Sequence, residues 1–265
     1  MDLQAIDGVV MDMDGVLWRG NEPMPGLVRF FNMLHAKDIP YVLATNNSRQ
    51  SRAAYIEKLS KMGVEGVAID RIITSGTATA RYMQERYPVG SRVYMIGGDG
   101  LRGVLLDAGY EIADYEVVAV VAGIDFELTY DKLRRATLLI RGGADFIGTN
   151  PDVTFPTPVG LAPGAGSILA ALVASTDVEP HIIGKPAAPM FEQALKILGT
   201  APEKTLMIGD RLGTDILGGN NAGMKTALLL TGVSTREELP NSDIQPDWVF
   251  EGLLDLIEAW GEDIE

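Results

Sequence analysis

Residues 6–17 read IDGVVMDMDGVL, and this stretch decides the fold. Its first part, Ile6–Asp12, is a short apolar run with β-branched residues, which predicts a buried strand. Asp12 and Asp14 follow at its end, and residues i and i+2 of an extended chain point to the same side. Gly15 then allows a sharp turn. The stretch therefore predicts an anionic pocket for a divalent ion at the end of a strand, although Asp and Gly also simply end strands.

Strand-like and helix-like segments alternate along the rest of the chain. Such alternation predicts parallel strands joined by right-handed crossovers, with ligand sites at the carboxyl ends of the strands. The further predicted strands are Tyr41–Thr45, Ile72–Ile73, Val93–Ile96, Val117–Ala122, Asp145–Ile147, Thr205–Ile208, Thr226–Leu230 and Trp248–Phe250. The predicted helices are Pro25–Lys37, Arg52–Met62, Thr77–Tyr87, Leu101–Ala108, Asp131–Ile140, Gly166–Ala174, Met190–Leu198, one running through Leu217, and Leu253–Trp260.

The composition restricts the chemistry that the protein can perform. The 265 residues include no cysteine and only two histidines, which excludes thiolate catalysis, Cys-ligated metals and multi-His metal sites. A metal held by side chains must then sit on oxygen, which favours Mg²⁺. The net charge of −14 disfavours a nucleic acid or an anionic membrane as partner. No signal peptide and no apolar window of membrane-spanning length are recognisable, so we expect a cytoplasmic protein.

Two further groups of polar residues lie near predicted strand ends. Thr45-Asn46-Asn47-Ser48 offers hydroxyl and N–H groups to phosphate oxygens, or else caps the following helix. The stretch Ile208-Gly209-Asp210-Arg211 places a carboxylate after an apolar strand, and Asp215 follows one turn later. Lys185, between Gly184 and Pro186, is a cation that either balances these acids or is a solvated surface residue.

Taken in order, these blocks resemble the motifs of the haloacid dehalogenase (HAD) superfamily of phosphohydrolases. Between the second motif and Lys185, Gly148–Asp152 and Pro163–Ser167 resemble the NagD-like, or 4-nitrophenylphosphatase-like, subfamily. The resemblance implies an α/β fold, with a Rossmann-like, doubly wound parallel-sheet core and an inserted α/β cap domain. The expected core comprises residues 1–78 and 182–265, and the expected cap, with about three strands, comprises residues 79–181.

The resemblance also implies roles for the charged residues. Asp12 is expected to attack phosphorus and form an aspartyl-phosphate, and Asp14 to act as general acid and then as general base. Mg²⁺ is expected on Asp12, the backbone carbonyl of Asp14, Asp210 and Asp215. Lys185 is expected to neutralise the nucleophile and bind the transferring group. An acid at position 14 suits an alcohol leaving group, which indicates a phosphatase.

The remaining expected contacts concern the substrate. Thr45, Asn46 and Asn47 are expected to bind phosphate oxygens, and Asn150 and Asp152 either touch the leaving group or cap a turn. The expected partner is a small phosphorylated metabolite such as a sugar phosphate, nucleoside monophosphate, phosphoglycolate or pyridoxal phosphate, with 4-nitrophenyl phosphate as an artificial substrate. A homodimer through the caps is also expected.

Two other functions stay open at this point. One is a HAD-fold binding protein without catalysis. The other is a dinucleotide-binding cap, because Gly98–Gly103 fits G-x-G-x-x-G after a predicted strand, although a tight strand–helix turn gives the same pattern. Trp18 and Arg19 follow the expected nucleophile, where HAD proteins have a mobile flap. They could gate solvent, or Trp18 could simply pack.

Overall fold

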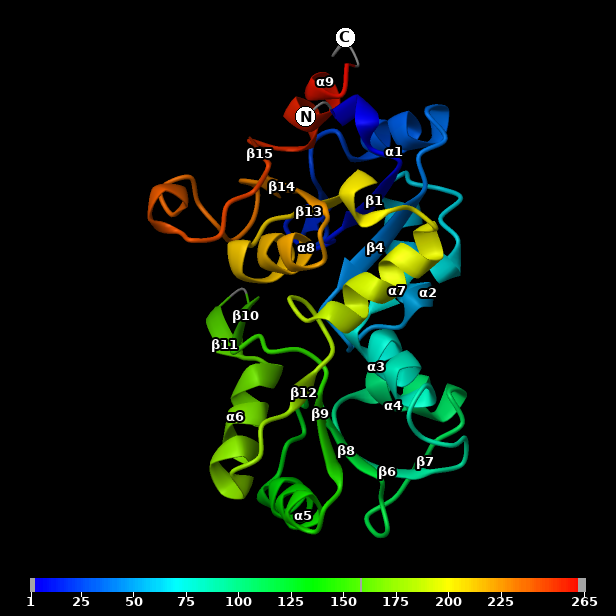
Figure 1. The fold of residues 1–265 in the computed structure, drawn as a ribbon, viewed down its shortest axis with the longest axis vertical. Helices are drawn as coiled ribbons and strands as arrows, with labels where there is room; N and C mark the ends of the chain where they lie inside the picture. The colour runs from blue at the N-terminus through cyan, green and yellow to red at the C-terminus, as the bar shows by residue number, and fades with distance from the viewer. Residues whose placement is uncertain (1–2, 158, 262–265) are drawn as a thin grey trace. The chain divides into compact units, whose positions relative to one another are not determined.

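The computed structural model describes residues 3–157 and 159–261 (Figure 1). The chain forms two compact units. The first unit comprises Met1–Thr45, Arg52–Ile73 and Met190–Glu265, and the second comprises Asn46–Ser51 and Thr74–Pro189. The expected α/β class with parallel sheets is confirmed. The domain boundaries expected from the sequence stay a prediction.

The first unit is built on a six-stranded sheet in the order β15-β14-β13-β1-β4-β5. The neighbouring strands from β15 to β4 are all parallel. The strands are β1 (Gly8–Met11), β4 (Tyr41–Thr45), β5 (Ile72–Thr74), β13 (Thr205–Gly209), β14 (Lys225–Leu229) and β15 (Trp248–Phe250). The residues of β1, β4 and β13 are buried throughout, as the continuous apolar runs of the sequence predict for a sheet covered on both faces.

Helices of the first unit cover this sheet and bring the described chain ends together. They are α1 (Leu27–Ala36), α2 (Arg52–Lys61), α8 (Leu217–Asn221) and α9 (Leu253–Ala259), and α7 (Ala188–Leu198) begins at the unit boundary. The rings of Phe30 on α1 and Trp260 after α9 lie 6.4 Å apart. Gln4 Nε2 donates to the carbonyl oxygen of Trp260 at 2.8 Å, so the two ends of the chain are tied to each other.

The second unit contains a five-stranded parallel sheet in the order β12-β9-β8-β6-β7. Its strands are β6 (Arg92–Ile96), β7 (Glu111–Ile112), β8 (Ala119–Ala122), β9 (Asp145–Gly148) and β12 (His181–Ile182). The expectation of about three strands was wrong, because β7 and β12 are two residues long and too short to show a periodic pattern. The helices are α3 (Ser75–Gln84), α4 (Asp99–Asp107), α5 (Tyr130–Arg141) and α6 (Ala165–Thr176).

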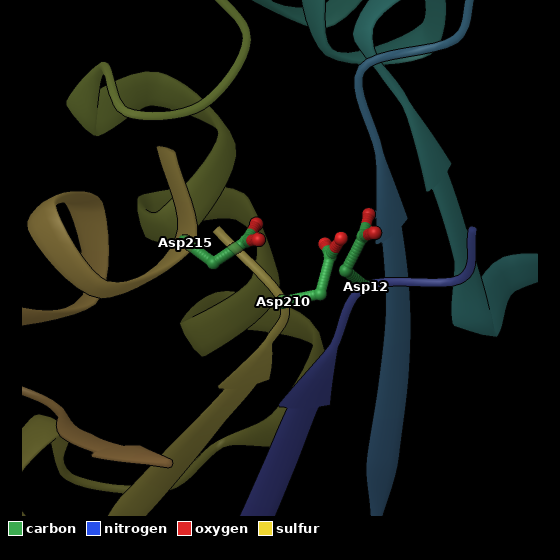
Figure 2. A group of neighbouring side chains, drawn as sticks. All are labelled: Asp12, Asp210 and Asp215. Carbon is green, nitrogen blue, oxygen red and sulfur yellow. The ribbon is translucent and has the colours of Figure 1, made fainter. Parts of the chain in front are cut away.

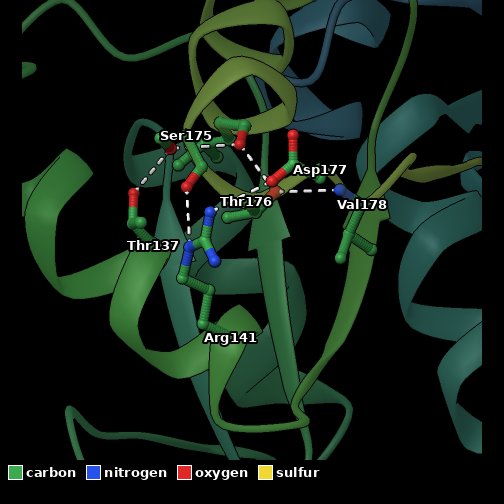
Figure 3. Close-up of polar contacts among 7 residues, drawn as sticks. Thr137, Arg141, Ser175, Thr176, Asp177 and Val178 are labelled. Carbon is green, nitrogen blue, oxygen red and sulfur yellow. Dashed lines mark hydrogen bonds and ion pairs between the residues drawn. The ribbon is translucent and has the colours of Figure 1, made fainter.

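Polar contacts join the carboxyl ends of α5 and α6 (Figure 3). The hydroxyls of Thr137 and Ser175 lie 2.8 Å apart, and Arg141 donates to the Ser175 carbonyl at 2.8 Å. Arg141 also pairs with Asp177, which adopts a left-handed conformation (φ 60°) at the end of α6. These contacts supply partners to carbonyls that the end of a helix leaves open.

Two short antiparallel hairpins were not expected from the sequence. One pairs β2 (Trp18–Arg19) with β3 (Glu22–Pro23), and the other pairs β10 (Thr154–Thr157) with β11 (Gly160–Pro163). Within the described residues, every helix is too short or too polar to cross a membrane.

The buried carboxylate of Asp125 gives a test of packing in the second unit. It accepts from the Lys132 ammonium at 2.8 Å and from the backbone N–H of Glu127 at 2.8 Å. Asp125→Ala is expected to lower the free energy of unfolding by about 2 kcal/mol, because both donors lose their acceptor. Urea denaturation measures the change. The control is Arg134→Ala, which removes an exposed pair with Asp131 and is expected to cost less than about 1 kcal/mol. Equal losses in the two variants would contradict the prediction.

Candidate active site

Asp12 and Asp210 meet because their strands are neighbours. β1 and β13 pair in parallel with Met11 opposite Ile208, and each strand is followed directly by an aspartate. The backbone N–H of Asp12 continues the ladder by donating to the Ile208 carbonyl at 2.9 Å. Two acids at the same end of adjoining parallel strands are thereby placed side by side, as the sequence predicts.

Asp215 completes a group of three carboxylates (Figure 2). It lies on one turn of π-helix, η4 (Leu212–Ile216), which precedes α8 where the sequence suggested a regular helix. One oxygen of each of Asp12, Asp210 and Asp215 lies within 4.8 Å of the others, and all three residues are buried. π-Type turns are rare and recur at functional sites.

Three buried carboxylates at this distance repel one another and have lost most of their hydration. Backbone donors offset part of this cost: Val233 N–H donates to Asp210 Oδ2 at 2.8 Å, and Arg211 N–H donates to Asp215 Oδ2 at 3.1 Å. A hard divalent cation bound by oxygen offsets it further, and the donor set contains only oxygen. The arrangement therefore fits a metal such as Mg²⁺.

Two glycines allow the backbone to approach these acids closely. Gly15 has φ 90°, and a Cβ on it would lie 2.6 Å from Asp210 Oδ2. A Cβ on Gly232 would lie 1.8 Å from the same oxygen. The sequence predicts the turn at Gly15, whereas the close approach at Gly232 was not predicted. The available signal was a glycine shortly after a predicted strand, at the edge of the sheet that carries Asp12 and Asp210.

The Asp14 carboxylate is not part of the three-acid group. β1 ends at Met11, so the chain is no longer extended at residues 12–14 and the two side chains need not share a side. Asp14 Oδ1 instead accepts from the indole N–H of Trp18 at 2.7 Å. A metal contact through the backbone carbonyl of Asp14 stays a prediction.

Thr45 is the last residue of β4, which pairs with β1 on the side opposite β13. It is buried, and it ends its strand at the same edge of the sheet as Asp12. This position agrees with a phosphate-binding hydroxyl, a role that stays a prediction.

The other expected phosphate-binding residues belong to the second unit, where Asp152 connects them. Asp152 Oδ2 accepts from the side-chain amides of Asn46 at 2.8 Å and Asn150 at 2.7 Å. The Asn46 amide nitrogen also donates to the Lys185 carbonyl at 2.9 Å, so both of its hydrogens are used within the protein. Asn47 Oδ1 accepts from the Arg49 N–H at 3.0 Å, which is a turn contact. The Asn46 side-chain amide is therefore engaged within the protein, which makes its backbone N–H the better candidate donor to a phosphate.

The glycine motif Gly98–Gly103 has a structural explanation. Gly98 precedes α4, as a strand–helix turn requires. A Cβ on Gly100 would lie 2.4 Å from the Arg49 carbonyl oxygen and 2.5 Å from that of Ser48. The close approach that a dinucleotide fingerprint reserves for pyrophosphate is here taken by the protein's own backbone.

Comparison with known proteins decides the family. A family model described as haloacid dehalogenase-like hydrolase matches residues 9–111, and a second model of HAD-like hydrolases matches residues 182–256. The acid sugar phosphatase of Staphylococcus epidermidis is 41% identical over 245 residues, covering 92% of this chain and 94% of that protein. The chain belongs to the haloacid dehalogenase-like hydrolases. Within this family it is a phosphatase, as expected from its motifs.

Solved structures place this HAD phosphatase in the NagD-like subfamily. The 4-nitrophenylphosphatase of Thermotoga maritima superposes with a TM-score of 0.92 at 37% identity, covering 97% of this chain and 98% of that one. NagD of Escherichia coli K-12 superposes with a TM-score of 0.88 at 30% identity, covering 99% of each chain. The expected subfamily and the expected enzyme class are both confirmed.

Gly232 provides a test of the site's close packing. Gly232→Ala is expected to lower phosphatase activity about 10²-fold, because the new Cβ must displace the Asp210 carboxylate. Hydrolysis of 4-nitrophenyl phosphate measures the loss. Gly213→Ala is the matched control, since a Cβ at Gly213 on η4 meets nothing within 4 Å. Undiminished activity of Gly232→Ala would show that the reaction does not depend on the position of the Asp210 carboxylate.

Proposed function

We propose that this HAD phosphatase hydrolyses small phosphomonoesters through an aspartyl-phosphate on Asp12, with Mg²⁺ as cofactor. The observation that carries the proposal is the group of three buried carboxylates, Asp12, Asp210 and Asp215, at adjoining strand ends. These three residues would hold Mg²⁺, together with the backbone carbonyl of Asp14. Bound there, the ion would neutralise charge on the transferring phosphoryl group.

The residues of the first unit divide the reaction between them. In the first step an oxygen of Asp12 attacks phosphorus, the bond to the alcohol oxygen breaks, and protonated Asp14 gives its proton to that oxygen. In the second step the Asp14 carboxylate takes a proton from water. The water oxygen attacks phosphorus, which releases phosphate and regenerates the Asp12 carboxylate. At the end of each turnover Asp14 is protonated again, and the phosphoryl group has left as phosphate.

We propose further roles for residues that resemble the family motifs. The hydroxyl of Thr45 and the backbone N–H of Asn46 would bind phosphate oxygens, and Lys185 would balance the charge of the nucleophile and the phosphoryl group. Lys185 is only 2% exposed, which supports a charge-balancing role over that of a solvated surface lysine. Asn47 and Asn150 stay weaker candidates, because Asn47 Oδ1 already accepts from the Arg49 N–H and the Asn150 amide already donates to Asp152.

A sugar phosphate is the substrate class that the relatives support best, because the S. epidermidis protein at 41% identity is an acid sugar phosphatase. A panel of phosphorylated sugars, nucleoside monophosphates, phosphoglycolate and pyridoxal phosphate, assayed by phosphate release with and without Mg²⁺, tests this proposal. A higher kcat/KM for another class than for every sugar phosphate would overturn it. The homodimer and the cytoplasmic location stay predictions.

Asp12→Asn tests the nucleophile. The variant is expected to lose at least about 10³-fold in kcat, because an amide oxygen is a poor nucleophile for phosphorus. It is expected to melt no lower than the wild type without metal, since it removes one of three crowded negative charges. Asp7→Asn, at the other end of β1, is the control and should keep full activity. Near-normal turnover by Asp12→Asn in the presence of Mg²⁺ would contradict the assignment of Asp12 as nucleophile.

Metal removal tests the cofactor. EDTA is expected to abolish turnover and added Mg²⁺ to restore it. Independently of activity, Mg²⁺ about 100-fold above its dissociation constant should raise the melting temperature by several degrees, because it binds only the folded chain. Asp210→Asn should lose most of this shift, whereas Glu203→Gln, which changes an exposed acid on the 3₁₀-helix η3 (Pro202–Lys204), should keep it. Activity that survives chelation would contradict the assignment.

A further inference from the structure

The indole of Trp18 joins a buried ring to an exposed carboxylate. The Trp18 residue is fully buried, whereas Asp14 is exposed. The Trp18 N–H donates to Asp14 Oδ1 at 2.7 Å. A buried N–H that cannot reach water needs an acceptor in the protein, so this contact stabilises one orientation of both side chains.

Trp18 is itself held rigidly on the first unit. It begins the hairpin β2–β3, and its carbonyl accepts from the Gly15 N–H at 2.8 Å, which closes the turn that carries Asp14. Its ring stacks near Tyr55 of α2, with centroids 6.3 Å apart, and Lys58 Nζ lies 4.1 Å from the ring centroid. Burial lowers the pKa of the Lys58 ammonium, and the Asp14 carboxylate opposes that shift. The backbone turn, Tyr55 and Lys58 together hold the indole donor in place.

The contact engages Oδ1 of Asp14 and leaves Oδ2 to act in general acid catalysis. An exposed aspartate rotates about two torsions, and general acid catalysis requires its oxygen within hydrogen-bond reach of the leaving group. Pinning Oδ1 restricts this rotation while Oδ2 stays available. Misplacement of a catalytic group by about 1 Å costs on the order of 10²-fold in rate.

We propose that Trp18 is a positioning residue for Asp14, whose indole N–H holds the general acid in the orientation that protonates the leaving group. This inference rests on the proposed function, because it assigns Asp14 the role of acid. It separates Trp18 from the two roles considered from the sequence, packing and solvent gating. Either of those would affect all substrates to a similar extent.

Leaving groups of different basicity distinguish these roles. The 4-nitrophenolate ion leaves with little help from an acid, whereas phenolate is more basic and depends on protonation, and the two esters are close in size. The quantity to compare is kcat/KM, because it covers the steps up to leaving-group departure and excludes hydrolysis of the aspartyl-phosphate. Purified full-length protein with saturating Mg²⁺ is assayed on 4-nitrophenyl phosphate and phenyl phosphate.

Three variants are compared with the wild type. Trp18→Phe keeps an aromatic ring and removes the N–H. Trp18→His is smaller, but its Nε2 occupies the position of the indole nitrogen in the five-membered ring and restores a donor. Trp260→Phe is the matched control: its ring is also buried, directly after α9, and packs against Phe30 of α1. Thermal melting establishes that each variant is folded.

Trp18→Phe is expected to lose about 10–100-fold in kcat/KM on phenyl phosphate and less than about threefold on 4-nitrophenyl phosphate. Trp18→His should recover part of the loss on phenyl phosphate despite packing less well, and Trp260→Phe should change neither value. Equal losses on both esters in Trp18→Phe, or no recovery in Trp18→His, would overturn the proposal. Failure of the proposed function is distinguishable, because the wild type would then hydrolyse neither ester.

A measurement on folded wild-type protein covers the case in which Trp18→Phe does not fold. The indole N–H resonance of Trp18, assigned with Trp248→Phe and Trp260→Phe, should lie downfield as a hydrogen bond to a carboxylate requires. Asp14→Ala should move it upfield, and Asp7→Ala should not. If Asp14→Ala leaves the chemical shift of the Trp18 indole N–H unchanged, the contact does not exist in solution and the proposal is overturned.

Discussion

The meeting of like charges at one edge of a parallel sheet constrains the rest of the first unit. β1 and β13 are neighbouring parallel strands, so the acids that follow them, Asp12 and Asp210, lie close together. The π-turn then brings Asp215 to the same place. Hydrophobic packing of the strands fixes this register, because a slip of one residue would move every side chain to the opposite face and disrupt its packing there. Packing of the core thereby holds together a charge arrangement that is unfavourable by itself and favourable with a cation.

This constraint explains why backbone groups, rather than side chains, line Asp210 in the surrounding loops. A Cβ at either position would collide with the Asp210 carboxylate, so Gly15 and Gly232 let main chain pass against Asp210 Oδ2. The Val233 N–H that follows donates to the same oxygen. The Thr231 hydroxyl donates to the Gly15 carbonyl at 2.6 Å and ties the two glycine loops together. Fixed backbone dipoles of this kind orient a charged group without reorganising during reaction.

How far the sequence predicted this site depends on the kind of contact. Asp12, Asp210 and Thr45 were predictable, because strand periodicity and the meeting of parallel strand ends follow from local pattern. Gly232, the Trp18–Asp14 bond and the Asp152–Asn46 bond were not identified, because they depend on loop paths and on rotamers selected by packing. The two-residue strands β7 and β12 are too short for any periodic signal, and the π-turn at residues 212–216 has no sequence period of its own. Tertiary packing decided each of these features.

Two aspartates only two residues apart acquire different chemistry from their surroundings. Asp12 is buried with two other acids, where a bound cation would offset the charge of the proposed nucleophile. Asp14 lies beyond the end of β1, outside that group, and its carboxylate accepts from the neutral indole N–H of Trp18. A carboxyl group removed from the cation can carry a proton to a leaving group and accept one back from water. The end of one strand at Met11, and the turn at Gly15 that follows, would therefore separate the proposed nucleophile from the proposed acid within three residues.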